Sequence, residues 1–336
     1  MSRSVLAPLE AAIPTHSVFR ERLANGLTVL VRRDTSAPVV AIVTYVKAGY
    51  FDEADDQVGI AHVLEHMYFK GTPTRGVGAI AKETKANGGY LNAGTIYDHT
   101  HYYTVLPASG FEAGIGIQAD AYANSLIDAG ELGRELEVII EEAKRKADNP
   151  VALSTETLYA LLHDHHRIRR WRIGREAGLR TFTRTMVDRF YRNYYRPSNT
   201  VVAIVGDVDP AEAFALAEHH YGSLTDAPVA RSAGPVEPDV PQPTFRYAES
   251  SGDIQQAELV FGWRTPPMTH PDTPVLDLLA AVLGGGRASR LYRSVRERRL
   301  ASAVSAYNYT PTDVGVFVVH ATARPALATS AARAAT

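Results

Sequence analysis

The residues of this chain best suited to chemistry are two histidines and a glutamate in the stretch 59–70, which reads GIAHVLEHMYFK. His62 and His66 are four residues apart, so on a helix their imidazoles lie on one face and can bind a single metal ion. Glu65 directly precedes His66 and projects from nearly the same face, within reach of a water molecule at that ion. The pattern therefore predicts a metal site with an adjacent proton acceptor.

A five-residue pattern also occurs by chance, and the same residues could form a structural cluster or be unrelated surface residues. The neighbouring residues favour a metal site over these alternatives. Leu64, Met67 and Phe69 help to make the helix apolar around most of its circumference, which predicts that it is buried. Buried ionisable groups need partners, and a metal would supply one. The H-x-x-E-H order reverses the H-E-x-x-H order of common zinc peptidases and is the signature of inverted zincins.

Two predicted strands precede this helix and position it. Asn25-Gly26 predicts a turn before a strand at 27–33, and the run VVAIVTYV predicts a second strand at 39–46. Gly71 and Pro73 end the helix. We also expect helices at 77–86, 111–123, 131–147, 154–163, 185–194, 211–221, 273–283 and 289–299, a strand–turn–strand segment at 90–106, and strands at 200–205, 257–263, 303–309 and 314–322.

The composition is that of an ordinary globular protein of 336 residues, with 45% hydrophobic and 21% charged residues. A net charge of −2 gives no electrostatic argument for binding nucleic acid, and no apolar run approaches the roughly 20 residues of a membrane span. The absence of cysteine leaves only histidines and carboxylates to bind a metal. Glu10 and two prolines interrupt the N-terminal segment, which predicts a cytoplasmic protein, or a periplasmic one if the start is mis-assigned.

Five prolines in a short polar stretch predict a semi-rigid linker at 228–244. We therefore expect an N-terminal extension at 1–18, a zinc-binding catalytic domain at 19–227 and a second domain at 245–336. The strand–helix–strand order after the linker resembles the order before it, which suggests an internal duplication.

A catalytic zinc site needs three protein ligands and an open position, so a third ligand must lie elsewhere in the chain. The predicted helix at 131–147 offers the carboxylates of Glu135, Glu137, Glu141 and Glu142, and spacing alone does not choose among them. His99 and His101 could form a second metal site, but a position on the polar face of a strand explains them better.

Four segments together resemble the pitrilysin and mitochondrial-processing-peptidase family of zinc metallopeptidases. They read GIAHVLEHMYFKGT, GGYLNAGTIYDHTHYYTVLP, RELEVIIEEAKRKADNP and YYRPSNTVVAIVGDVDP, and they occur in the family's order. The later GGGRASRLYRSVRERRLASAVSAY resembles the family's second domain. The resemblance implies an α+β fold, in which a mixed, mostly antiparallel sheet has helices on one face. It also implies that this arrangement is repeated as two similar domains, of which the second is truncated here.

The resemblance also assigns ligands. In the family the third ligand is the last glutamate of a V-I-x-x-E stretch about 76 residues after the second histidine, which here is Glu142. Glu135 matches a glutamate that orients a ligand imidazole, although an ordinary surface glutamate would also fit that position. The implied cofactor is one Zn²⁺ per chain, held by His62, His66 and Glu142, with Glu65 as the general base.

Three further residues match substrate-binding positions of the family. Asn92 and Ala93 match a segment on a sheet edge that pairs with an extended peptide, although Asn92 could equally mark a strand bend. Arg296 matches an arginine that the second domain presents to the substrate. Ser302 stands where many family members have tyrosine, so assistance from that side is in doubt.

We therefore predict a zinc-dependent endopeptidase that hydrolyses peptides or unfolded segments. The alternative is a non-catalytic or partner-dependent subunit of a heteromeric peptidase of the same family, which the short second domain and Ser302 favour. No feature of the sequence indicates a metal-dependent hydrolase of a non-peptide substrate. The expected partners are the peptide substrate and a second subunit, identical or related, with no nucleic acid.

Overall fold

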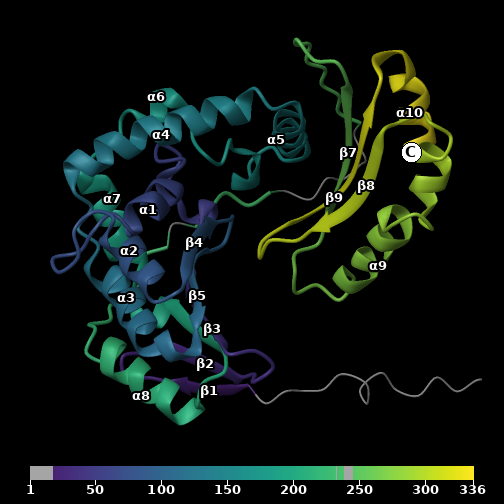
Figure 1. Cartoon of the computed structure of the whole chain (residues 1–336). Helices are drawn as coiled ribbons and strands as arrows, with labels where there is room; N and C mark the ends of the chain where they lie inside the picture. Colours follow the sequence, from purple (N-terminus) through teal and green to yellow (C-terminus); the bar gives the residue numbers. More distant parts are fainter. Residues whose placement is uncertain (1–17, 232, 238–244) are drawn as a thin grey trace, which may run out of the picture.

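The computed structural model describes residues 18–231, 233–237 and 245–336. The predicted N-terminal extension at 1–18 lies almost wholly outside these residues, and the predicted linker at 228–244 lies partly outside them. The chain forms two units, each built on its own sheet (Figure 1). One sheet has six strands and the other has three.

The six-stranded sheet has the order β1-β2-β6-β3-β5-β4. Its strands are β1 (Phe19–Arg22), β2 (Thr28–Arg33), β3 (Val39–Val46), β4 (Tyr90–Thr95), β5 (Thr100–Pro107) and β6 (Thr200–Gly206). Only β2 and β6 are parallel, and the other neighbouring strands are antiparallel, so the prediction of a mixed, mostly antiparallel sheet is confirmed. β1 was not predicted because its sequence, FRER, lies exposed at the sheet edge and lacks an apolar face.

Helices cover one face of this sheet (Figure 1). The helices of the first unit are α1 (Ile60–Tyr68), α2 (Ala79–Ala86), α3 (Phe111–Asn124), α4 (Ala129–Ala147), α5 (Pro150–Leu162), α6 (Glu176–Leu179), α7 (Arg184–Tyr194) and α8 (Pro210–Tyr221). The central strand β3 shows why the helices gather on one side. Its residues Val40, Ile42 and Val46 are fully buried, while the alternate residues on the other face remain partly accessible.

The second unit repeats part of the first. Its strands β7 (Ala257–Thr265), β9 (Gly315–Ala323) and β8 (Ala303–Tyr309) form an antiparallel sheet in the order β7-β9-β8. Within the first sheet, β3-β5-β4 has the same order, directions and chain sequence. Helix α9 (Thr273–Gly284) follows β7 as α1 follows β3, and α10 (Ala328–Ala335) follows β9 as α3 follows β5. The shared topology supports the predicted duplication.

The two units touch through α5, which packs on β7. A Cβ atom added at Gly262 of β7 would lie 2.7 Å from a methyl carbon of Leu158 on α5, so glycine permits this close approach. Glu237 connects the units again, because its carboxylate accepts hydrogen bonds from three backbone N–H groups at 164–166 and lies 2.6 Å from Arg264 of β7. In the turn between β8 and β9, the backbone N–H of Thr312 donates a further hydrogen bond to the carboxylate of Asp98.

One predicted helix is corrected by the structure. The segment 289–299 has a π-helical turn, η6 (Tyr292–Arg296), in place of a regular helix, and it ends with Arg299 at a positive φ of 58°. The remaining predicted helices and strands are present, with ends that shift by a few residues. In the part of the chain that the structure describes, no helix has the length and apolar character needed to cross a bilayer.

Candidate metal centre

Helix α1, which carries the H-x-x-E-H residues, is held at its first turn by a buried carboxylate. Its first turn follows Gly59, which has a φ of 101° and whose Cβ position would lie 2.7 Å from Ile173 O. Glu53 accepts hydrogen bonds from Gly59 N and Ala61 N, so it satisfies backbone donors that have no partner within the helix. Burial raises the pKa of Glu53 to about 8. No sequence pattern had indicated this residue.

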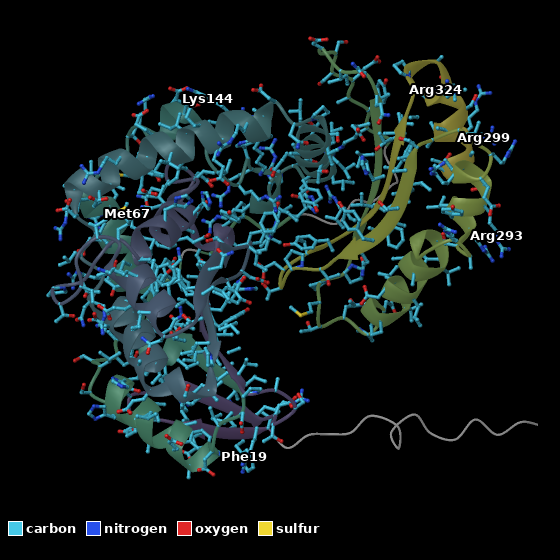
Figure 2. All side chains as sticks on the ribbon, in the orientation of Figure 1. Phe19, Met67, Lys144, Arg293, Arg299 and Arg324 are labelled. Atoms are coloured by element: carbon cyan, nitrogen blue, oxygen red, sulfur yellow. The ribbon has the colours of Figure 1, made fainter. Side chains whose placement is uncertain are left out.

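Helix α4 packs against α1 and brings the acidic residues to it. Asp128 caps α4 by accepting hydrogen bonds from Gly130 N and Glu131 N. Leu132, Ile139 and Ile140 bury the inner face of α4 in the main core. In Figure 2, Met67 marks α1 and Lys144 marks α4.

His62, His66 and Glu142 are the three residues that the structure brings together, and their ligand atoms all lie within 4.8 Å of one another. Glu142 Oε2 lies 3.9 Å from His62 Nε2 and 3.7 Å from His66 Nε2. Burial, helped by the neighbouring His66, lowers the pKa of His62 to about 3, so its imidazole is neutral and free to coordinate at ordinary pH. Two imidazoles and one carboxylate match the donor set of catalytic zinc sites.

Glu65 lies beside these three residues and is held by Thr95. Thr95 Oγ1 donates to Glu65 Oε2 over 2.5 Å from the end of strand β4. Burial raises the pKa of Glu65, and the nearby Glu142 also raises it, whereas Thr95 and His66 act in the opposite direction. A carboxyl group with a raised pKa is suited to exchange protons near neutral pH.

Glu135 bridges His66 and a lysine that sequence reasoning missed. Glu135 Oε2 lies 3.1 Å from His66 Nδ1, and Lys70 Nζ donates to Glu135 Oε1. Burial by itself raises the pKa of Glu135, but the hydrogen bonds with Lys70 and His66 outweigh it and lower the pKa. A carboxylate on Nδ1 favours the tautomer that leaves Nε2 of His66 open to a metal. Lys70 lies just past the end of α1 at Tyr68, so a helix-face pattern does not include it and no sequence signal indicated it.

Asn92 and Ala93 lie on β4, the edge strand of the first sheet. The backbone N–H of Ala93 donates to Asn92 Oδ1 over 2.8 Å. This N–H group is thus already satisfied by a side chain of its own strand. Among the described strands β4 pairs with β5 alone, and β4 also carries Thr95, so this sheet edge leads directly to Glu65.

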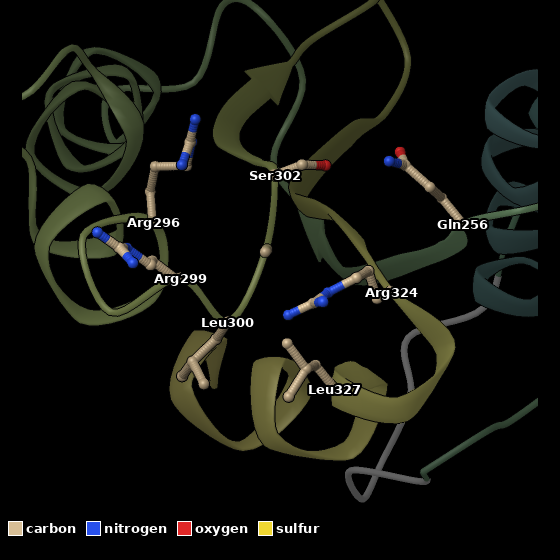
Figure 3. A pocket seen from close by; sticks show the side chains of 8 residues that line it. Gln256, Arg296, Arg299, Leu300, Ser302, Arg324 and Leu327 are labelled. Atoms are coloured by element: carbon tan, nitrogen blue, oxygen red, sulfur yellow. The ribbon is translucent and has the colours of Figure 1, made fainter.

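Arg296 lies apart from the metal centre, on the second unit. It lines a cavity of about 250 Å³ together with Arg299, Arg324, Ser302 and Gln256, and no metal-centre residue contributes to the lining. Figure 3 shows that Arg296 and Arg299 come from the segment before β8, whereas Arg324 follows β9. The hydroxyl of Ser302 donates to Thr322 O over 3.0 Å.

Two family models match the chain in tandem. The one described as "Insulinase (Peptidase family M16)" matches residues 28–173, and the one described as "Peptidase M16 inactive domain" matches residues 181–335. The chain belongs to the M16 peptidase family. The resemblance that the sequence motifs indicated is thereby confirmed.

Relatives of this M16 chain extend the match along nearly its whole length. An uncharacterized zinc protease of Rickettsia felis is 32% identical over 309 residues, covering 89% of this chain and 72% of that protein. An uncharacterized zinc protease of Mycobacterium tuberculosis is 32% identical over 330 residues, covering 96% of this chain and 73% of that protein. The crystal structure of a protease from Helicobacter pylori matches with a TM-score of 0.84 at 26% identity, covering 94% of this chain and 78% of that chain. These matches support the M16 fold and a protease-like role.

Proposed function

We propose that this M16 chain is a zinc-dependent endopeptidase that hydrolyses peptides or unfolded segments. The observation that carries the proposal is the convergence of His62, His66 and Glu142 within 4.8 Å, with Glu65 beside them. Among the described residues, this is the one group of three or more potential ligands that could hold a metal ion.

Each residue of the metal centre has its own role in the proposed reaction. When bound, one Zn²⁺ per chain would supply a Lewis acid that polarises a peptide carbonyl and lowers the pKa of water. Glu65 accepts a proton from the attacking water and returns it to the leaving amine, a role that its raised pKa supports. Thr95 keeps the Glu65 carboxylate turned toward β4, and Glu135 keeps the His66 imidazole in position.

The free edge of β4 suits an extended peptide. A peptide strand that pairs with this edge gains main-chain hydrogen bonds with little dependence on sequence, and it passes the Thr95–Glu65 pair at the end of the strand. Ala93 N–H becomes available to such a peptide when the Asn92 side chain rotates away. We assign Asn92 and Ala93 to substrate binding on this basis, and we keep Arg296 as a substrate contact implied by its family motif.

A second candidate function is a partner-dependent or non-catalytic subunit. The observation that favours it is the match of residues 181–335 to the family model described as inactive. A second subunit, identical or related, would then complete the peptidase.

Cleavage of a quenched fluorescent peptide library, with and without o-phenanthroline, tests the proposal. A self-sufficient zinc peptidase cleaves the library, loses the activity with chelator and regains it with added Zn²⁺. Cleavage that chelator does not affect would contradict a zinc mechanism. Zinc-loaded chain that cleaves no peptide would favour the partner-dependent subunit.

A further inference from the structure

Glu156 of α5 is a buried carboxylate that has no role in the reaction described above. Its side chain is only 5% exposed, and it lies between two cations. Lys146 Nζ of α4 donates to Glu156 Oε1 over 2.5 Å, and Arg172 Nε lies 3.0 Å from the same oxygen. Buried ion pairs add little net stability, and their best-attested role is to fix how elements fit together. These three groups therefore indicate a constraint on how α4 is placed.

Lys146 lies on the face of α4 that points to the metal centre. Glu135, Glu142 and Lys146 are spaced i, i+7 and i+11 along α4, which places them on one face of the helix. Lys70 holds Glu135, and Glu156 holds Lys146, so α4 is anchored on both sides of Glu142. Within the described part of the chain, Glu142 itself forms ion pairs with the two histidine ligands alone. Its position thus depends on where α4 lies.

The segment that carries Arg172 seats the first turn of α1. Ile173 O lies so close to Gly59, the residue before α1, that no side chain fits between them. Arg170 donates to the backbone carbonyl of Glu53, whose side chain accepts hydrogen bonds from the first N–H groups of α1. The neighbours of Arg172 on both sides therefore fix the start of the helix that carries the histidine ligands.

Helix α5, which carries Glu156, is held from its other side by the second unit. Leu158 and Tyr159 follow Glu156 by two and three residues and belong to a core that also contains Val316 and Val318 of β9. α5 also packs on β7. A residue that positions other groups must itself be locked by packing, and this core supplies that support.

We propose that Glu156 is a positioning residue that sets Glu142 relative to the histidines of α1, by holding Lys146 and Arg172 together. The proposal rests on the zinc site of the proposed function and adds what fixes the third ligand of that site. Apolar packing between α1 and α4 is non-directional, whereas an ion pair fixes one register. A metal site needs such precision, because its ligand distances vary by only about 0.2 Å.

A purely electrostatic role of Lys146 makes the opposite prediction. Lys146 lies one turn after Glu142, so its ammonium group is a cation beside a site for Zn²⁺, and the two charges repel each other. If charge alone mattered, removing this ammonium group would strengthen zinc binding. If Lys146 anchors α4, the same change weakens zinc binding, because Glu142 loses its fixed position. The sign of the change separates the two roles.

The zinc affinity of the full 336-residue chain, measured by competition with a chelating dye, tests the proposal. Lys146→Met should bind zinc about tenfold or more weakly, as when other groups that support a metal ligand are removed. Adding Glu156→Gln should weaken binding little further, because the two residues act as one unit. Lys146→Arg keeps the cation and should restore most of the affinity.

Lys144→Met is the matched control. Lys144 lies on the same helix and pairs with the exposed Glu141 at the surface, so its removal should leave zinc affinity unchanged. If Lys146→Met proves unfolded in a thermal scan, Lys146→Gln replaces it. Glutamine keeps a hydrogen-bond donor for Glu156, and a smaller loss of the same sign is expected.

A crystal structure of Lys146→Met gives a readout that needs no metal. Glu142 Oε2 lies 3.9 Å from His62 Nε2 in the unaltered chain, and this distance should lengthen. Unchanged or higher zinc affinity in Lys146→Met, an equal loss in Lys144→Met, or an unmoved Glu142 would each overturn the proposal. An unaltered chain that binds no zinc would contradict the proposed function, and the position of Glu142 in the variant would still decide this inference.

Discussion

Helices α1 and α9 occupy corresponding places on two sheets of the same topology, yet α1 carries the H-x-x-E-H residues and the outer face of α9 is aliphatic. The two helices can be compared from their first residues, Ile60 of α1 and Thr273 of α9. Counted from these residues, Val275, Leu278 and Leu279 of α9 stand where α1 has its H-x-x-E-H residues. The same backbone position therefore holds two imidazoles and a carboxylate in one unit and three aliphatic side chains in the other.

The difference follows from what covers each helix. The polar residues of α1 are partly or fully buried, and they have partners on α4 and β4, namely Glu142, Glu135 and Thr95. Polar groups in such a place are tolerated only when they are paired or bind a metal. α9 has no such partners among the described residues, and its outer face is aliphatic. The fold thus supplies the position, and the covering helix decides whether that position can hold a metal.

The largest effect is expected at Glu65, whose counterpart on α9 is Leu278. Glu65→Gln removes the proton acceptor and keeps the size and the Thr95 contact of the side chain. We expect turnover of a fluorescent peptide to fall by about 10²–10⁴-fold, the usual contribution of a general base. Zinc content measured on the same sample should stay unchanged. Undiminished turnover in this variant would show that Glu65 is not the base.

An intermediate effect is expected at Lys70, which by the same count corresponds to Leu283 of α9, a partly buried residue packed against the second core. Lys70→Met removes the ammonium group that holds Glu135 and so loosens the His66 imidazole. We expect zinc affinity, measured by competition with a chelating dye, to fall about tenfold or more, as for other residues that support a metal ligand. Lys82→Met on α2, an exposed lysine, is the matched control. Equal zinc affinity in both variants would contradict the positioning role of Lys70.

The smallest effect is expected at Glu237, which joins the two units. Burial by itself would raise the pKa of Glu237, but three backbone N–H donors and Arg264 outweigh it and lower the pKa to about 2. The charged carboxylate therefore stabilises the folded chain at pH values above about 4.3, which is the pKa of a glutamate in the unfolded chain. This contribution is lost as the pH falls through about 2, the pKa of Glu237 in the folded chain.

At pH 7 we expect Glu237→Gln to lower the melting temperature by about 2–4 °C, the shift for a loss of roughly 1 kcal/mol in a domain of 150–250 residues. Scanning calorimetry from pH 7 to pH 2 measures this difference, which should vanish at the acid end. A constant difference over that range would mean that the charge of Glu237 does not hold the units together.

The sequence predicted the metal helix because its signal is local. The spacing of His62, Glu65 and His66 on one turn of a helix contains the whole constellation. The third ligand is different, because four glutamates of one helix were equally suitable by spacing and only the family resemblance pointed to Glu142. The structure shows the physical reason. The crossing of α4 over α1 turns Glu142 toward both histidines, while Glu141 contacts Lys144 at the surface.

Residues that support the site could not be predicted, because packing between elements, and not a local pattern, sets their hydrogen bonds. Glu53 contacts the start of α1 from 6 and 8 residues away, whereas Lys70 and Thr95 contact Glu135 and Glu65 from 65 and 30 residues away. The segment 289–299 has the composition of a helix, yet Arg299 adopts a left-handed conformation that joins it to β8. A sequence of good helix formers does not reveal such a constraint.

The proposed function requires that α1 and α4 together form one zinc site, and zinc stoichiometry tests this requirement. Mass spectrometry of the metal content should find one zinc per chain, and Glu142→Gln should lose it on dialysis against a mild chelator. Glu141→Gln is the matched control, because Glu141 is the adjacent residue of α4 and its side chain is 63% exposed. It should keep its zinc. A chain without zinc, or equal retention in the two variants, would contradict the assignment of Glu142 and the metal centre built on it.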